Sequence, residues 1–111
     1  MNNKILVIIS SSDVGKAHTG AMYAVNALRN NWMTEVRLFF FGPAETLLLN
    51  DEELQQIVEE FNALDEKPVA CKFIAEKDKA DKQLTELGVS VEYVGEPISN
   101  LIKQGYVPMV W

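Results

Sequence analysis

The sequence has few of the residues that build disulfides and metal sites. It contains one cysteine and one histidine in 111 residues. No intramolecular disulfide can form, and the His/Cys ligand set of a structural zinc site is missing. We therefore expect no metal site, a fold that depends on its hydrophobic core, and a reducing cytoplasmic location that suits a free thiol.

Long apolar runs and a basic surface are also missing. Only five apolar residues, Ile5–Ile9, precede a serine cluster, whereas a signal peptide needs about 7–15 and a membrane span about 20. Acidic residues outnumber basic ones, 16 to 10, for a net charge of −6. The lysines between residues 67 and 82 alternate with acidic residues and form no basic patch. We expect neither a membrane nor a nucleic acid as a partner, since phosphate-binding surfaces are basic.

What the sequence does contain is a regular alternation of strand-like and helix-like segments. Short β-branched or aromatic runs at 4–10, 35–41, 68–71 (extending at most to 73), 89–93 and 106–111 are typical of buried parallel strands. Helical spacing covers 16–30, 44–49, 51–64, one charged segment from 72 to about 87, and 95–104. Pro108 cannot donate to a ladder, so the last strand should lie at an edge.

This alternation predicts the fold class. We expect one domain, residues 1–111, with an α/β fold: a mainly parallel five-stranded sheet between helices on both faces, a three-layer α/β/α sandwich. In such folds ligands bind beyond the carboxyl ends of the strands. The segments to search are therefore 10–19, 41–45, 71–75 and 93–97.

The first of these segments is only superficially like a nucleotide-binding loop. Ser10 stands where a P-loop has its first glycine, and Ala17 replaces the hydroxyl that would hold magnesium. The motif therefore does not predict a nucleoside triphosphatase. Ser11 and Lys16 lie beside a helix N-terminus and can still hold an anion. The alternative is that Asp13 or its neighbour simply caps the helix.

The lone cysteine has two interpretations. Free cysteine is often a buried core residue, and Cys71 would be one if its strand continued to Phe73. If the strand ends at Cys71, the thiol lies at the start of a helix, where the dipole and the adjacent Lys72 favour a thiolate. His18 can act as a proton shuttle or thiolate partner if strands one and three are neighbours, as in flavodoxin-like ordering. Otherwise it is an exposed helix residue.

The chain also resembles a known family over nearly its whole length. The segments that carry the likeness are Lys4–Ser10 with the alanine-rich first helix, then Pro68–Cys71, the charged helix ending at Leu87-Gly88, Val89–Tyr93, and Gly105-Tyr106. This pattern resembles the DsrE/DsrF-like family. The resemblance implies a flavodoxin-like, DsrE-like three-layer fold that assembles as a homo-oligomer, whether trimer, hexamer or dimer. It also implies that a cysteine after the third strand carries a persulfide between protein partners without a cofactor, and Cys71 occupies that position.

Two functions are therefore open. The first is a sulfur carrier or sulfurtransferase that acts through Cys71, with His18, Ser11, Lys16 and Lys72 as binding or thiol-supporting residues; it predicts an exposed, reactive thiol. The second is a non-catalytic subunit on the same fold, which binds a small anion or nucleotide-like ligand at the strand ends or serves in assembly.

Overall fold

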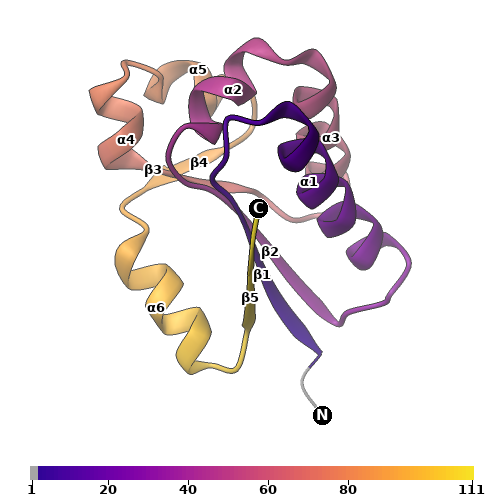
Figure 1. The fold of residues 1–111 in the computed structure, drawn as a ribbon. Coiled ribbons are helices and arrows are strands. Elements are labelled where there is room, and N and C mark those ends of the chain that lie inside the picture. Colours follow the sequence, from indigo (N-terminus) through magenta and orange to yellow (C-terminus); the bar gives the residue numbers. More distant parts are fainter. Residues whose placement is uncertain (1–2) are drawn as a thin grey trace.

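Strands and helices alternate along the chain as the sequence predicts. The computed structural model describes residues 3–111 (Figure 1); residues 1 and 2 of the predicted domain 1–111 lie outside that part. The strands are β1 (Lys4–Ile9), β2 (Glu35–Phe40), β3 (Val69–Cys71), β4 (Ser90–Glu92) and β5 (Val107–Val110). The helices are α1 (Val14–Arg29), α2 (Ala44–Asn50), α3 (Glu52–Asn62), α4 (Lys72–Lys77), α5 (Asp81–Glu86) and α6 (Gly95–Lys103).

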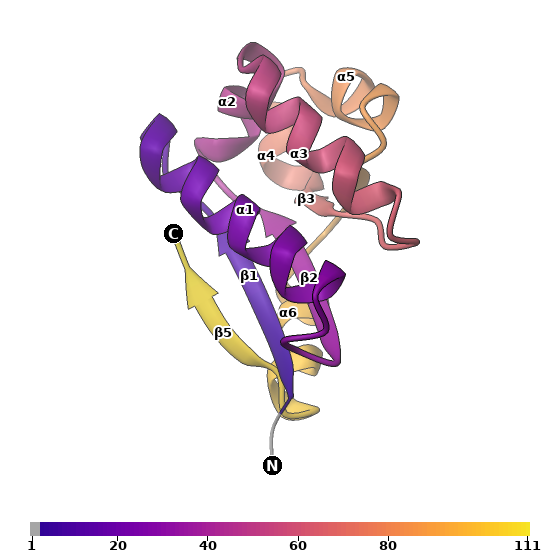
Figure 2. The same ribbon diagram turned by 90° about the vertical axis from the view of Figure 1, so that its right-hand side faces the viewer.

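The strands form one parallel sheet in the order β4-β3-β2-β1-β5. The chain steps in one direction from β1 to β4 and then returns past β1 to form β5. Because parallel crossovers are right-handed, the returning helix α6 must lie on the opposite face from α1 and α3. Figures 1 and 2 show this arrangement. The predicted flavodoxin-like three-layer α/β/α class is confirmed, and β5 is the predicted edge strand.

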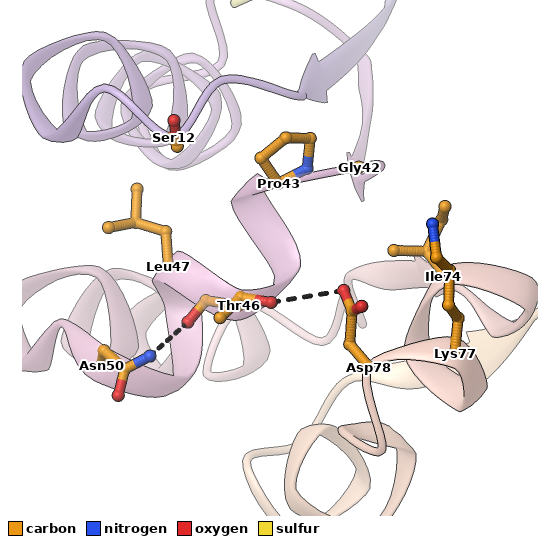
Figure 3. A pocket seen from close by; sticks show the side chains of 9 residues that line it. All are labelled: Ser12, Gly42, Pro43, Thr46, Leu47, Asn50, Ile74, Lys77 and Asp78. Atoms are coloured by element: carbon orange, nitrogen blue, oxygen red, sulfur yellow. Dashed lines mark hydrogen bonds between the residues drawn. The ribbon is translucent and has the colours of Figure 1, made fainter.

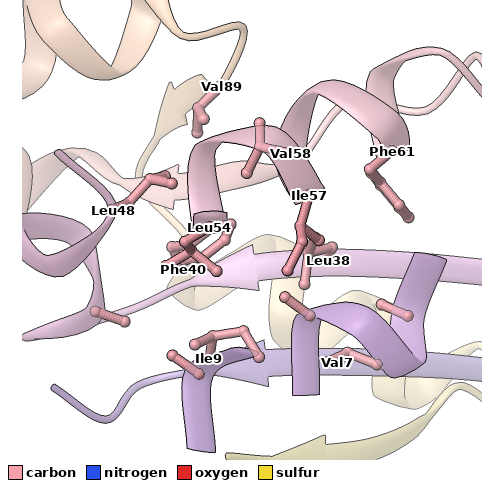
Figure 4. Close-up of a cluster of buried hydrophobic side chains, with 14 of the residues drawn as sticks. Val7, Ile9, Leu38, Phe40, Leu48, Leu54, Ile57, Val58, Phe61 and Val89 are labelled. Carbon is pink, nitrogen blue, oxygen red and sulfur yellow. The ribbon is translucent and has the colours of Figure 1, made fainter. Parts of the chain in front are cut away.

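Alternate side chains of β1 point to opposite faces of the sheet, into the two halves of the hydrophobic core. Val7 and Ile9 pack on the larger side, against α1, α2 and α3 (Figure 4). Leu6 and Ile8 face the other side, where α6 is the covering helix. Helix α1 lies close to the sheet because its inward residues are small, with Ala17, Ala21, Ala24 and Ala27 fully buried. This packing leaves the carboxyl edge of the strands to the loops and short helices that follow them.

The charged segment after β3 differs from the prediction. The expected single helix from 72 to about 87 is two short helices, α4 and α5. Lys79 adopts a left-handed φ of 56° between them, and the turn lets Ala80 and Leu84 both become buried. The extension of the third strand to Phe73 is also wrong, because Cys71 is the residue that precedes α4. No helix between residues 3 and 111 is both long and apolar enough to cross a membrane.

Candidate functional site

The cysteine lies at the carboxyl end of the sheet. Cys71 is the last residue of β3, and the chain enters α4 directly after it. Its side chain belongs to the α6-side cluster with Ile8, Phe39 and Val94, and the residue is 6% exposed. The prediction of an exposed thiol is therefore wrong for this conformation. The thiol is covered, but it stands at the edge of the core.

A buried carboxyl group lies beside the cysteine. Glu45, in the first turn of α2, is 0% exposed. Among residues 3–111 it is the one charged residue that is buried. Its Oε2 accepts a long hydrogen bond of 3.4 Å from the Gly42 N–H, while Oε1 accepts none. The backbone N–H of Cys71 also approaches this carboxyl. Glu45 thus brings a carboxyl to the backbone N–H groups of Gly42, after β2, and of Cys71, at the end of β3.

The environment of Glu45 changes its acidity. Burial raises the pKa of the Glu45 carboxyl from 4.5 to about 7, because the charged form loses its solvation. The approaching N–H groups of Gly42 and Cys71 lower the pKa, and the negative charge of Asp78 raises it. Both protonation states are therefore populated near neutral pH, which is unusual for a glutamate and typical of functional carboxyls.

Exposed aromatic side chains follow the three neighbouring strands β2, β3 and β4 at this edge. Phe41 follows β2, Phe73 lies in α4 and Tyr93 follows β4, and they are 38%, 65% and 62% exposed. The Lys72 Nζ lies over the Tyr93 ring, 5.4 Å from its centroid. We call Phe41, Phe73 and Tyr93 the aromatic rim. Large apolar groups of this kind on one edge are typical of contact surfaces.

A cleft opens on the other side of the same strand ends (Figure 3). It has a volume of about 540 Å³ and lies between the loop after β1, α2 and α4. Its lining residues are Ser12, Gly42, Pro43, Thr46, Leu47, Asn50, Ile74, Lys77 and Asp78. The Thr46 hydroxyl donates to Asp78 across the cleft at 3.4 Å. The Asp78 that borders the cleft is the same residue whose charge acts on Glu45.

His18 lies elsewhere. The expectation that strands one and three are neighbours is wrong, because β2 lies between them. The His18 Nε2 instead pairs with Asp51, and its Nδ1 lies 3.3 Å from Glu53. The hydrogen bond from His18 lowers the pKa of Asp51, which also caps α3. His18 therefore links α1 to the start of α3, and the structure does not bring it to Cys71.

The polar groups of the loop after β1, residues 10–13, form hydrogen bonds within the loop and with other parts of the protein. Asp13 caps α1 by accepting from the Lys16 N–H at 3.0 Å, which is the plainer of the two predictions for this segment. The Ser11 hydroxyl accepts from the Asp13 N–H, and the Ser11 N–H donates to Trp111. The structure thus places Ser11 and Lys16 at the helix start but not beside the cysteine. Lys72 is the predicted supporting residue that adjoins Cys71 in the chain.

Glu45 lies in the predicted segment 41–45, but the sequence did not single it out as a candidate. It follows Gly42-Pro43 and begins a short helix, a position where acidic residues are common and solvated. No pair of carboxylates had a spacing that indicated acid/base chemistry. The one available signal was that the residue comes directly after a fully buried strand, at the edge where sites in this fold are found. No cluster of metal-ligating side chains is present among residues 3–111.

Comparisons with known proteins support the fold. No protein-family model and no curated protein sequence matches the chain. Among solved structures, a conserved protein of unknown function from Bacteroides thetaiotaomicron, BT1422, matches with a TM-score of 0.85 and 25% identity, over 98% of this chain and 96% of that one. The YchN protein from E. coli matches with a TM-score of 0.72 and 17% identity, over 97% and 99%. The chain is therefore similar in fold to small α/β proteins along almost its whole length.

Proposed function

We propose that this protein is a sulfur carrier that holds a persulfide on Cys71, as its resemblance to the DsrE/DsrF-like family implies. The observation that carries the proposal is the position of Cys71 at the carboxyl end of β3, beside the buried Glu45 carboxyl. Ligand chemistry in this fold belongs to that edge. A thiol there needs no cofactor to accept sulfur, and a reducing cytoplasm would keep it free.

The aromatic rim supports the same function. A carrier must receive sulfur from one protein thiol and pass it to another, so its cysteine has to lie within a docking surface. Phe73 follows Cys71 by two residues and Tyr93 follows β4, the strand that pairs with β3, and both rings are exposed. Aromatic residues that become buried on binding are common anchors of protein interfaces. We propose that donor and acceptor proteins contact the rim. We also propose that the chain forms a homo-oligomer.

The burial of the Cys71 thiol is compatible with sulfur carriage. A persulfide is more reactive than a thiol, and a covered position slows its loss to small thiols in solution. Sulfur exchange then requires side chains of the α6-side cluster around Cys71 to move, and Ile74 and Ile98 are only partly buried against it.

Intact-mass analysis tests the carrier. The native protein is incubated with a small persulfide donor, with Cys71→Ala alongside. A gain of about 32 Da, the mass of one sulfur, reversed by dithiothreitol and absent from Cys71→Ala, is the expected result. A wild-type protein that gains no sulfur would reject the proposal.

A variant of the rim separates docking from chemistry. Phe73→Ser should leave sulfur uptake from a small donor unchanged, since the exposed ring supplies no reacting group. Transfer from a persulfidated protein donor should slow because an apolar anchor is lost. Sedimentation velocity of wild type and variant reads out oligomer formation in the same samples. Equal protein-to-protein transfer rates would exclude Phe73 from the docking surface.

The cleft supports a second candidate, a subunit that binds a small ligand. Its volume suits a small molecule, and Lys77 is a cation on its wall. Asp78 stands next to that cation, so a ligand with both donor and acceptor groups fits better than a simple phosphate. Thermal-shift measurements with phosphate and with nucleotides test this function, and unchanged melting temperatures would reject the anion and nucleotide versions.

A further inference from the structure

The thiol of Cys71 can exchange sulfur only where another sulfur can reach it, and in the structure it is covered. The buried members of its cluster are Leu6, Ile8, Phe39, Cys71, Val94 and Tyr106. Partly buried side chains from two helices pack against this cluster: Ile98 and Leu101 from α6, and Ile74 from α4. Access to the sulfur therefore requires part of this cover to move, and the two helices differ in how firmly they are held.

The path of the chain brings the start of α6 toward the cysteine. Strand β4 pairs with β3 so that Glu92 is the register partner of Cys71. Val94 comes two residues later and is buried in the same cluster as Cys71. The Ile98 N–H donates to the Val94 carbonyl at 2.9 Å, which places Ile98 one helical turn further along the same side. Figures 1 and 2 show α6 crossing the face of the sheet opposite to α1 and α3.

Helix α6 is weakly held. None of its 9 residues, all of which the structure describes, is buried, whereas α4 has the fully buried Ala75. A helix shorter than about 12 residues is marginal in water and depends on its packing. The N-cap residue, Val94, has no side-chain oxygen to accept from the free N–H groups of the first turn. Partial burial of a few side chains is therefore what keeps α6 on the sheet.

The two ends of α6 combine firm anchors with glycines. Val94 before the helix and Tyr106 after it are buried, and the Tyr106 hydroxyl donates to Glu35 Oε1 at 2.7 Å. Between these anchors, Gly95 begins the helix and Gly105 follows its end with a φ of 96°. Glycine backbone rotates at little steric cost. Segment 95–105 can therefore lift as a local opening while both anchors stay in the core.

We propose that α6 is a lid over Cys71, which lifts to admit a sulfur donor or acceptor and closes over the persulfide between exchanges. This inference rests on the proposed carrier function and adds to it the element that controls access to the thiol. The open state is a minor population of the native protein, and exchange proceeds only from that state.

The sulfur transfer that occurs in the open state balances without an oxidant or a reductant. The Cys71 thiolate attacks the outer sulfur of a donor persulfide, R–S–SH. A bond forms between Sγ and that sulfur while the donor S–S bond breaks, and the electron pair of that bond leaves on the donor sulfur. The proton lost by Cys71 passes through solvent to the leaving sulfur, so the products are Cys71–S–SH and R–SH.

Alkylation of Cys71 measures the opening without any sulfur chemistry. Native proteins are mixed with N-ethylmaleimide, and the adduct is followed by intact mass. If the lid closes faster than the reagent reacts, the rate is proportional to the open fraction. Ile98→Ala should react about tenfold faster than wild type, because a partly buried side chain that holds the lid closed is lost. Ile102→Ala is the matched control: the same change in the same helix at an exposed position should leave the rate near that of wild type.

A variant in the other half of the core separates lid opening from unfolding of the whole protein. Val58 is fully buried on α3, so Val58→Ala should lower global stability and leave the alkylation rate near that of wild type. Alkylation of Val58→Ala as fast as that of Ile98→Ala would mean that only global unfolding exposes the thiol, and would overturn the inference. Ile74→Ala reacting faster than Ile98→Ala would place the opening in α4 and would overturn it too.

Hydrogen exchange of the wild type tests the lid without any variant. The backbone amides of residues 98–104 should exchange much faster than those of β1, because they open locally rather than with the whole domain. Equal protection of the two segments would overturn the inference.

Sulfur loading links the lid to the carrier function. With glutathione persulfide as donor, Ile98→Ala should load faster than wild type by the same factor as it is alkylated. Faster alkylation with unchanged loading would overturn the lid as the control of sulfur exchange, while the carrier would stand. A wild-type protein that takes up no sulfur, in a series alkylated as expected, would reject the carrier, whereas the opening of α6 would be retained.

Discussion

The burial of Glu45 predicts a specific dependence of stability on pH. Its pKa rises from 4.5 to about 7 on folding because the buried carboxylate loses solvation. Between these values the folded state binds more protons at this site than the unfolded state. The contribution of Glu45 to the free energy of unfolding must therefore fall as pH rises through that interval, by about 1.4 kcal/mol per pH unit, or about 3 kcal/mol in all.

The substitution Glu45→Gln removes this penalty and keeps the shape of the side chain. At about pH 3.5 and below, where the wild-type carboxyl is protonated in both the folded and the unfolded state, the two proteins should differ by a constant offset. The variant should then gain on the wild type as pH rises, reaching about 3 kcal/mol relative to that offset at pH 8. This sign is unusual, because most paired carboxylates stabilise a protein as pH rises.

Urea denaturation at several pH values measures the effect. The difference in unfolding free energy between variant and wild type is plotted against pH, so that the titration of all other groups cancels. Glu59→Gln serves as the matched control, since Glu59 is exposed on α3 and should give a nearly flat difference. A flat difference for Glu45→Gln as well would show that the carboxyl is solvated in the folded protein, and would refute the reasoning from burial.

Two further substitutions test the packing of α1 and the start of α3. Gly20→Ala should destabilise the protein by about 1–3 kcal/mol, because a Cβ there would lie 2.6 Å from the Trp111 Cδ1 and 2.7 Å from the Ile9 Cδ1. Gly95→Ala is the control, since its Cβ would meet nothing within 4 Å; equal thermal melts for the two variants would contradict the contact. Asp51→Ala should cost about 1–2 kcal/mol by removing the cap on the Leu54 N–H. Asp51→Asn should retain most of that stability in urea titrations, and losses of equal size would show that the cap is not what matters.

Local signals account for most of the elements that the sequence predicts correctly. The apolar run in β1, the cap at Asp13 and the cap at Asp51 depend on residues within a few positions of one another. Gly88 and Gly105 have φ values of 88° and 96°, and each follows the end of a helix, as glycine in this conformation commonly does. Such features need no knowledge of the rest of the chain.

The errors come from elements that only meet in the folded protein. The predicted helix from 72 to 87 breaks at Lys79 because Ala80 and Leu84 are both drawn into the core, an effect that outweighs local helix preference. His18 was paired with the cysteine on the assumption of adjacent strands. In the structure β2 lies between β1 and β3, and His18 contacts Asp51 and Glu53 instead of Cys71.

The sequence by itself determined the class of fold and the identity of the lone thiol. A single cysteine at the end of a short buried segment is visible in one dimension, and so is the alternation that produces a parallel sheet. Only the tertiary structure decided that Cys71 is covered, and that Glu45 is buried with its carboxyl near the Cys71 backbone N–H. The physical reason is that burial and acidity depend on what packs around a group. The 25 residues between Glu45 and Cys71 do not fix which groups pack around either residue until the sheet forms.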